Sequence, residues 1–176
     1  YSAHRGYVGL TDSGRLVMWG DCGLLDTVTA AVEAQISDGV VSVAVMCLEL
    51  KCVIVAVKES GHMVVFGGGV YGTNIADPVV NLTDAMNFGI KAVTMTGRSF
   101  AAVRNDGSVV TWGQAGGGGD SSMVELELAD GVVRVVATFG AFAAIKENGR
   151  VVTWGFPAYG GNAHMHDAAL RDVVDV

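Results

Sequence analysis

One phrase of about fourteen residues recurs four times along the chain, and this repeat limits the folds open to it. Each copy has a short apolar lead, a polar turn ending in glycine, a second apolar stretch and an aromatic residue followed by glycine. The copies are YVGLTDSGRLVMWG (7–20), IVAVKESGHMVVFG (54–67), FAAVRNDGSVVTWG (100–113) and FAAIKENGRVVTWG (142–155). A period of about 40 to 50 residues is typical of β-propellers and other repeat arrays.

Each phrase predicts a β-hairpin. The turn glycine supplies the positive φ that a tight turn needs, and the aromatic residue recurs where it would face one shared core. The glycine after the aromatic residue ends the second strand. The expected structural signature consists of Gly14, Trp19, Gly20, Gly61, Phe66, Gly67, Gly107, Trp112, Gly113, Gly149, Trp154 and Gly155.

A third apolar stretch stands before three of the hairpins and again at the end of the sequence. These stretches are Asp38–Val45, Phe88–Met95, Asp130–Ala137 and Arg171–Val176. We therefore expect an all-β repeat domain over residues 1–176, with antiparallel three-stranded units of about 1–48, 49–97, 98–140 and 141–176. No third strand is expected before the Tyr7 hairpin. Pairing of Val173–Val176 with that hairpin would close a propeller ring, and a piece of a longer array is the alternative.

The variable linkers between the Trp-Gly dipeptides and the third strands predict short capped helices. Asp120, Ser121 or Asn162 would cap, and Val124 with Leu128 would face the core. Two linkers, Leu24–Ile36 and Val70–Met86, differ most between units and are where we expect specificity.

The run AVRNDGSVVTWG, with Asp106-Gly107 and Trp112-Gly113, resembles the repeat of the RCC1 (regulator of chromosome condensation) family in a short-repeat form. This resemblance implies a β-propeller and covers all four units. The histidine usual before the family's first strand is replaced here by Gly6, Val53, Ser99 and Ala141. The short form is similar to Trp-Gly repeats in multi-copy proteins of algae and other protists. The exchange-factor activity of the founding member does not carry over.

Composition narrows the classes of partner. The net charge of −7 disfavours nucleic acid, and no apolar run reaches the length of a membrane span. Peripheral association with a membrane complex stays open. Cys47 and Cys52 could pair, but with three cysteines in the chain we favour buried or half-buried thiols. The first residue is Tyr1 rather than Met, from which we expect a processed precursor, organellar (for example plastid) rather than secreted.

Several motifs have a chemical interpretation and a structural one. GGGVYG (67–72) fits a dinucleotide fingerprint, but it lacks a βαβ context, so we favour a flexible glycine loop. HMHD (164–167) could bind a metal, and we favour a solvated loop. The triplet at Asn81 is a glycosylation sequon by pattern. The turn acids could bind a cation or a basic partner, but turn formation explains them as well; they are Asp12, Glu59, Asp106 and Glu147.

The recurring residues are those of a scaffold, and no catalytic set can be assembled from the spacing. We expect a non-catalytic protein–protein interaction scaffold without cofactor or metal. It would be an accessory or structural subunit of a larger protein complex, with an organellar or photosynthetic membrane assembly of an alga as one setting. The alternative is a small-ligand-binding or enzymatic propeller with its site at the ring centre or the glycine loops.

Overall fold

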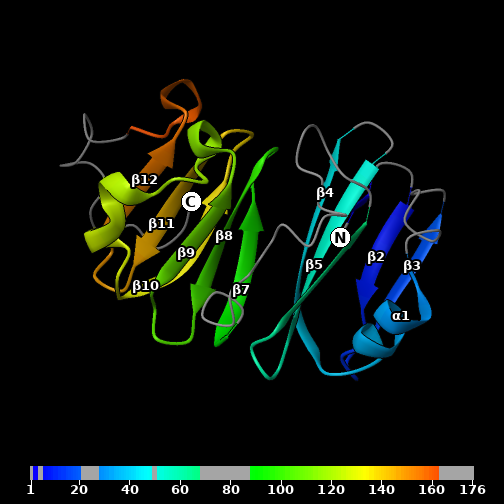
Figure 1. Cartoon of the computed structure of the whole chain (residues 1–176). Helices are drawn as coiled ribbons and strands as arrows, with labels where there is room; N and C mark the ends of the chain where they lie inside the picture. Colours follow the sequence, from blue (N-terminus) through cyan, green and yellow to red (C-terminus); the bar gives the residue numbers. More distant parts are fainter. Residues whose placement is uncertain (1, 4–5, 21–27, 49–50, 68–87, 163–176) are drawn as a thin grey trace. The chain divides into compact units, whose positions relative to one another are not determined.

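The computed structural model of the chain describes residues 2–3, 6–20, 28–48, 51–67 and 88–162, and these residues form four antiparallel three-stranded sheets (Figure 1). The strand orders are β1-β2-β3, β4-β5-β6, β7-β8-β9 and β10-β11-β12. The strands are β1 (Ser2–Ala3), β2 (Gly6–Leu10), β3 (Leu16–Gly20), β4 (Val40–Leu48), β5 (Lys51–Lys58), β6 (Met63–Gly67), β7 (Ile90–Met95), β8 (Ser99–Arg104), β9 (Val109–Gly113), β10 (Val132–Ala137), β11 (Ala141–Lys146) and β12 (Val151–Gly155).

The four predicted hairpins are confirmed, with the signature aromatics in register. Tyr7 pairs with Trp19, Ile54 with Phe66, Phe100 with Trp112, and Phe142 with Trp154. The predicted third strands β4, β7 and β10 lie at the edge of their sheets, beside the first hairpin strand. Each sheet is therefore a meander in which the residues of one repeat occupy the same places.

The first sheet departs from the expectation that nothing precedes its hairpin. The short strand β1 pairs with β2 through Ser2–Tyr7 and Ala3–Gly6. This expectation was wrong because a two-residue strand has no detectable alternation of apolar and polar residues. Residues 173–176, which were expected to supply this edge strand, lie outside the described residues, so ring closure stays a prediction.

The chain divides into two compact units, Tyr1–Ala92 (unit 1) and Val93–Val176 (unit 2). The core of unit 1 packs sheet residues such as Val8, Val43 and Ile54 against Ile36. The core of unit 2 contains Ala101, Val103, Val124, Leu128, Val132, Val135, Phe142, Ala144, Val152 and Trp154. In each unit a short helix thus covers an apolar layer made by two successive sheets.

The linker helices are confirmed in one case and altered in another. Helix α1 (Ala30–Ile36) begins at Thr29, whose side chain accepts a hydrogen bond from the Val32 amide. The expected helix after Asp120 is a kinked 3-10 helix, η3 (Ser122–Glu127). Val124 and Leu128 are buried as predicted, 3% and 2% exposed. The other predicted helices, including the one that Asn162 would cap, fall on residues 68–87 and 163–176, outside the described part.

Successive repeats are joined by the turn glycines. The carbonyls of Gly14, Gly61 and Gly107 accept hydrogen bonds from the first amides of the next third strands, Val40, Ile90 and Val132, at 2.9, 3.1 and 2.9 Å. Gly107 has φ +79°, and a Cβ there would lie 2.9 Å from the amide nitrogen of Gly131. The glycine is therefore needed twice, for the turn and for the close approach of the next repeat.

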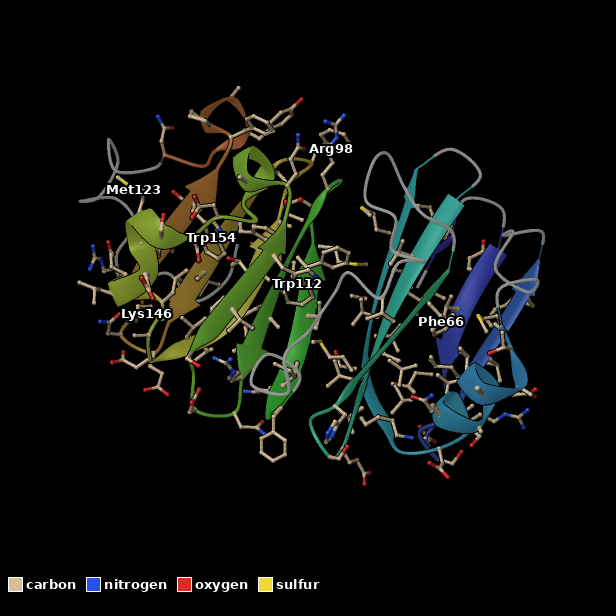
Figure 2. The ribbon with its side chains drawn as sticks, viewed as in Figure 1. Phe66, Arg98, Trp112, Met123, Lys146 and Trp154 are labelled. Carbon is tan, nitrogen blue, oxygen red and sulfur yellow. A yellow bond between two sulfur atoms is a disulfide. The ribbon has the colours of Figure 1, made fainter. Side chains whose placement is uncertain are left out.

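A lysine at the start of two hairpin turns binds the end of the preceding helix. Lys58 Nζ donates to the carbonyl oxygens of Gln35 and Asp38, the first at 2.7 Å. Lys146 Nζ donates in the same way to the carbonyl of Glu127 at 2.7 Å and to the carboxylate of Asp130 at 3.3 Å. Figure 2 shows Lys146 beside η3. These lysines satisfy carbonyls that a helix end leaves without intrahelical partners.

Cys47 and Cys52 form a disulfide across the β4–β5 hairpin, so the expectation of free thiols was wrong. The two residues are direct cross-strand partners in the ladder, which brings their Cα atoms within 4.0 Å. The sequence concealed this pairing because β4 and β5 both extend beyond the predicted apolar stretches. Disulfides persist in oxidising environments.

Alkylation under denaturing, non-reducing conditions is expected to label one cysteine per chain, and alkylation after reduction to label three. Because the bridge closes a loop of only a few residues, its loss should lower the free energy of unfolding by about 2 kcal/mol. Urea denaturation of the Cys47→Ala/Cys52→Ala double variant measures that loss. Labelling of all three cysteines before reduction would show that the bridge is absent.

Candidate functional site

Two glycine-rich turns of the same geometry follow the Trp-Gly dipeptides of unit 2. The first contains the 3-10 turn η2 (Ala115–Gly117) and the second η4 (Pro157–Tyr159), and each is capped by a left-handed glycine with φ 96°, Gly118 or Gly160. Matching backbone bonds, Gly119 N to Gln114 O and Gly161 N to Phe156 O, are both 3.0 Å. These two loops are hydrogen-bonded turns, at the place in the repeat where a flexible glycine loop was expected. Most of GGGVYG lies outside the described residues.

The first of these turns covers the aromatic pair of the next hairpin. Trp154 Nε1 donates to the carbonyl of Gly118 at 3.0 Å, and Phe142 stacks on Trp154 with ring centroids 5.2 Å apart. A Cβ on Gly118 would lie 2.6 Å from the ring of Phe142. Both rings are almost fully buried, at 1% and 4% exposure. Trp154 and Phe66 are buried in a core, where the recurring aromatic was expected, whereas Trp19 is 52% exposed and departs from that expectation. Trp154 also contacts the turn of the preceding repeat.

A pocket of about 250 Å³ lies on unit 2 beside these turns. Its lining includes three exposed aromatic residues, Phe139, Phe156 and Tyr159, which are 54%, 38% and 46% exposed. The ring of Tyr159 contacts the other two, with centroids 5.7 Å from Phe139 and 6.3 Å from Phe156. Hereafter these residues, with Arg98 and Gln114, are called the aromatic pocket.

The polar side of the aromatic pocket is formed by Arg98 and Gln114. Arg98 Nη1 donates to the side-chain Oε1 of Gln114 at 3.4 Å, and the Arg98 backbone carbonyl accepts from the Gln114 backbone amide at 3.0 Å. Figure 2 shows Arg98 well apart from Met123 on the same unit. A cationic planar group beside exposed aromatic rings can bind a carboxylate or stack on a further aromatic group.

Hydroxyl side chains hold the two turns in place around the pocket. Thr138 Oγ1 donates to the carbonyl of Tyr159 at 2.9 Å, and Thr96 Oγ1, at the matching position, donates to the carbonyl of Gly117 at 3.3 Å. The pocket is therefore built on ordered backbone, which limits the conformational entropy lost when a ligand binds.

A second cavity, of about 290 Å³, lies between β3 and α1 in unit 1 and includes Arg15 and Glu33 in its lining. None of the described residues that line it is aromatic. The aromatic pocket is therefore the better candidate for recognition.

Those chemical motifs that fall within the described residues form no second site. No group of three or more histidine, cysteine or acidic residues that could hold a metal occurs in the described ranges. The HMHD motif and Asn81 lie outside them. His62 contacts Ser60 and the edge of Phe88 at its own hairpin turn. The part of the chain that the structure describes also has no helix long and apolar enough to cross a membrane.

Among the turn acids, Asp106 acts within its own turn. Its carboxylate accepts hydrogen bonds from the Ser108 hydroxyl at 2.7 Å and the Ser108 amide at 2.9 Å. These bonds, the hydroxyl bond above all, hold the pKa of Asp106 below its ordinary value of 3.8. In the last hairpin the uncharged side chain of Asn148 takes the place of Asp106 and accepts the matching hydrogen bond from the Arg150 backbone amide. The turn therefore does not require a charged residue at this position.

Ser108→Ala is expected to raise the pKa of Asp106 toward 3.8, because the strongest bond to the carboxylate is removed. The stability that the lowered pKa contributes is present above pH 3.8 and is lost as the pH falls through the folded-state pKa. A carboxyl carbon NMR titration measures the change. Asp120, whose pKa is lowered by the Ser122 amide, is the internal reference and should not move. If the pKa of Asp106 stayed the same, the Ser108 hydroxyl would not be the cause of its lowered value.

The aromatic pocket was missed by sequence reasoning. Four of its residues stand outside the repeated phrases: Arg98, Phe139, Phe156 and Tyr159. Phe156 and Tyr159 lie in a loop that was interpreted from its glycines alone. A usable signal was present, since apolar aromatic residues flank both ends of the last hairpin where the other copies have polar or small residues.

The antiparallel three-stranded sheets and their order are those of β-propeller blades, and the described residues have the fold of part of a propeller. No protein-family model and no curated protein matches the sequence. Among solved structures it is similar to human WBSCR16, an RCC1-like propeller protein, with 18% identity and a TM-score of 0.51. The match covers 88% of this chain and 46% of that one.

A computationally designed protein, Ika8, also matches, with 11% identity and a TM-score of 0.47 over 88% of this chain and 44% of the designed one. The chain therefore spans about half the length of the propellers that it matches.

Proposed function

We propose that this protein is a non-catalytic interaction module that binds a partner protein through the aromatic pocket, as an accessory or structural subunit of a larger complex. The observation that carries this proposal is the clustering of three exposed aromatic rings and an arginine on ordered backbone. Aromatic residues and arginine are the types most enriched at the energetic centres of protein interfaces.

The chemistry of the pocket suits a short peptide segment. Its volume of about 250 Å³ lies below the range of about 300–1,000 Å³ typical of small-molecule sites, and it fits one large side chain. Arg98 next to the rings favours a segment with an apolar or aromatic residue close to a carboxylate. An acidic residue of the partner that lies at the rim of the pocket would contact Arg98. The rest of this chain is acidic, so the partner is expected to carry basic residues outside the pocket.

A small ligand is the second candidate function, because the aromatic pocket lies beside the glycine turns where such a site was expected. Gly117 and Gly140 both contribute to its lining. The two candidates differ in what should bind, a peptide of several residues or a single planar compound. Both require the same rings.

Selection of displayed peptides on the intact chain tests the proposal. The selected peptides should share an apolar or aromatic residue near an acidic one. Phe156→Ala and Tyr159→Ala should each weaken a selected peptide by about tenfold or more, since truncating a hot-spot residue costs about 2 kcal/mol or more. Fluorescence anisotropy measures the affinity.

Met123→Ala/Leu126→Ala is the matched control, because these apolar side chains of η3 are 93% and 90% exposed and neither is among the residues that line the pocket. The control should bind the peptide like the wild type. Equal binding by the pocket variants and the control would refute the site. Failure to select any peptide, together with binding of a planar compound lost in Phe156→Ala, would favour the small-ligand function.

A further inference from the structure

The turn of the last hairpin contains Asn148-Gly149, the one Asn-Gly dipeptide in the sequence. Asn148 is exposed, and Gly149 supplies the positive φ of the turn, 75°. Glycine has no side chain, so its backbone nitrogen is less hindered than that of any other residue. The side-chain amide of Asn148 therefore stands directly before a backbone nitrogen that is able to attack it.

The side chain of Asn148 is held in a way that favours such an attack. Its Oδ1 accepts a hydrogen bond from the Arg150 backbone amide at 3.0 Å. A donor at this oxygen stabilises the negative charge that develops there when the amide carbon is attacked. The nitrogen that would leave, Nδ2, has no hydrogen-bond partner within the described residues. The amide is thus activated at its oxygen and unrestrained at its nitrogen.

The attacking nitrogen is the part of the turn that has to move. The Gly149 amide donates to the Lys146 carbonyl at 2.9 Å, and this bond must open before the nitrogen can react. Local opening at an exposed hairpin tip costs far less free energy than global unfolding. The reaction should therefore be slower than in the unfolded chain, but it does not require the protein to unfold.

We propose that Asn148 is a modification site, at which hydrolytic deamidation converts the asparagine into aspartate or isoaspartate. The Gly149 nitrogen bonds to Asn148 Cγ, the Cγ–Nδ2 bond breaks, and the proton of the Gly149 amide leaves with the ammonia. Water then opens the resulting succinimide. Cleavage at Cγ gives aspartate, and cleavage at the backbone carbonyl gives isoaspartate, so the net reaction consumes water and releases ammonia. This inference is independent of the function proposed for the aromatic pocket.

The preceding hairpin shows that an aspartate product fits the turn. Asp106 stands there in the place of Asn148, and its carboxylate accepts the hydrogen bond of the backbone amide two residues on, at 2.9 Å. The turn glycines also match, with φ 79° at Gly107 and 75° at Gly149. The aspartate product therefore keeps the hairpin and makes its tip more acidic.

The isoaspartate product does not fit, because it inserts a methylene group into the backbone of the turn. Two hydrogen bonds depend on that backbone. One is the bond from Gly149 to Lys146, and the other joins the Glu147 amide to the Gly131 carbonyl at 2.8 Å. Isoaspartate therefore loosens the contact between the last hairpin and the start of β10.

Incubation of the purified full chain in mildly alkaline buffer, followed by peptide mapping with mass spectrometry, tests the proposal. Amide-to-acid conversion should accumulate at Asn148. The matched control is Asn105, an exposed asparagine in the turn of the preceding hairpin that is followed by Asp106 instead of glycine, and it should not convert measurably. A parallel sample in urea measures the reaction in the unfolded chain. Conversion of Asn148 in urea but not in buffer, or equal conversion at Asn105, would overturn the proposal.

Thermal melts test the two products. Asn148→Asp should melt within about 2 °C of the wild type, as expected for a surface substitution that keeps its hydrogen bond. The isoaspartyl form, separated by chromatography, should melt about 4–8 °C lower, for two lost hydrogen bonds. A large loss in Asn148→Asp would contradict the claim that the aspartate product keeps the turn.

Discussion

Trp154→Ala is expected to lower the free energy of unfolding by about 3–5 kcal/mol, the usual loss for a fully buried aromatic side chain. Trp154 is 4% exposed, stacks on Phe142 and donates to the carbonyl of Gly118. Its loss removes contacts within its own hairpin and with the turn of the preceding repeat together. Urea denaturation followed by circular dichroism gives the value without depending on tryptophan fluorescence.

Two further variants separate the parts of this effect. Trp154→Phe keeps an aromatic ring but leaves the Gly118 carbonyl without its donor, and should cost about 1–3 kcal/mol. Leu126→Ala, 90% exposed, is the control and should stay within about 0.5 kcal/mol of the wild type. If Trp154→Ala were no more destabilising than Leu126→Ala, the tryptophan would not anchor the repeats.

Gly107→Ala is expected to lower the free energy of unfolding by about 2–4 kcal/mol. A non-glycine residue in the left-handed region costs about 1–2 kcal/mol. In addition, the new Cβ would lie 2.9 Å from the Gly131 amide nitrogen and displace the strand whose Val132 amide donates to Gly107. Overpacking of this kind costs about 1–3 kcal/mol. The same denaturation measurement applies.

Gly160→Ala is the control that isolates backbone strain. Gly160 has φ 96°, but no described atom lies within 4 Å of its Cβ position, so this substitution should cost only about 1–2 kcal/mol. Equal losses of unfolding free energy in the two variants would mean that the close approach of the next repeat at Gly107 adds nothing to the cost of the substitution. A larger loss at Gly107 supports the glycine junction between repeats.

The repeated phrase made the fold predictable. Glycine turns, alternating strands and the recurrent tryptophan are local features, so the hairpins and their edge strands β4, β7 and β10 could be derived from sequence. The disulfide between Cys47 and Cys52 could not be derived in this way, because the pairing of the two cysteines depends on how far β4 and β5 extend. The strand β1 was too short to leave a pattern.

The candidate site was harder to predict because it arises between repeats. Phe139, Phe156 and Tyr159 belong to loops, and their clustering depends on the 3-10 turn that places Tyr159 near Phe139. Glycine content alone suggested a flexible loop. In the structure, backbone hydrogen bonds such as that from the Gly161 amide to the Phe156 carbonyl close this loop into a turn, as in Gln114–Gly119.

Binding of a partner protein through the aromatic pocket is the function proposed for this protein. Site-specific photo-crosslinking is its sharpest test, with a photoreactive phenylalanine analogue at Tyr159 or at Met123 of the full chain in extracts of its native source. A discrete crosslinked protein of one mass is expected at position 159, absent at position 123 and lost when Phe156→Ala is added. No discrete product at position 159, or the same product at both positions, would refute partner binding at the pocket.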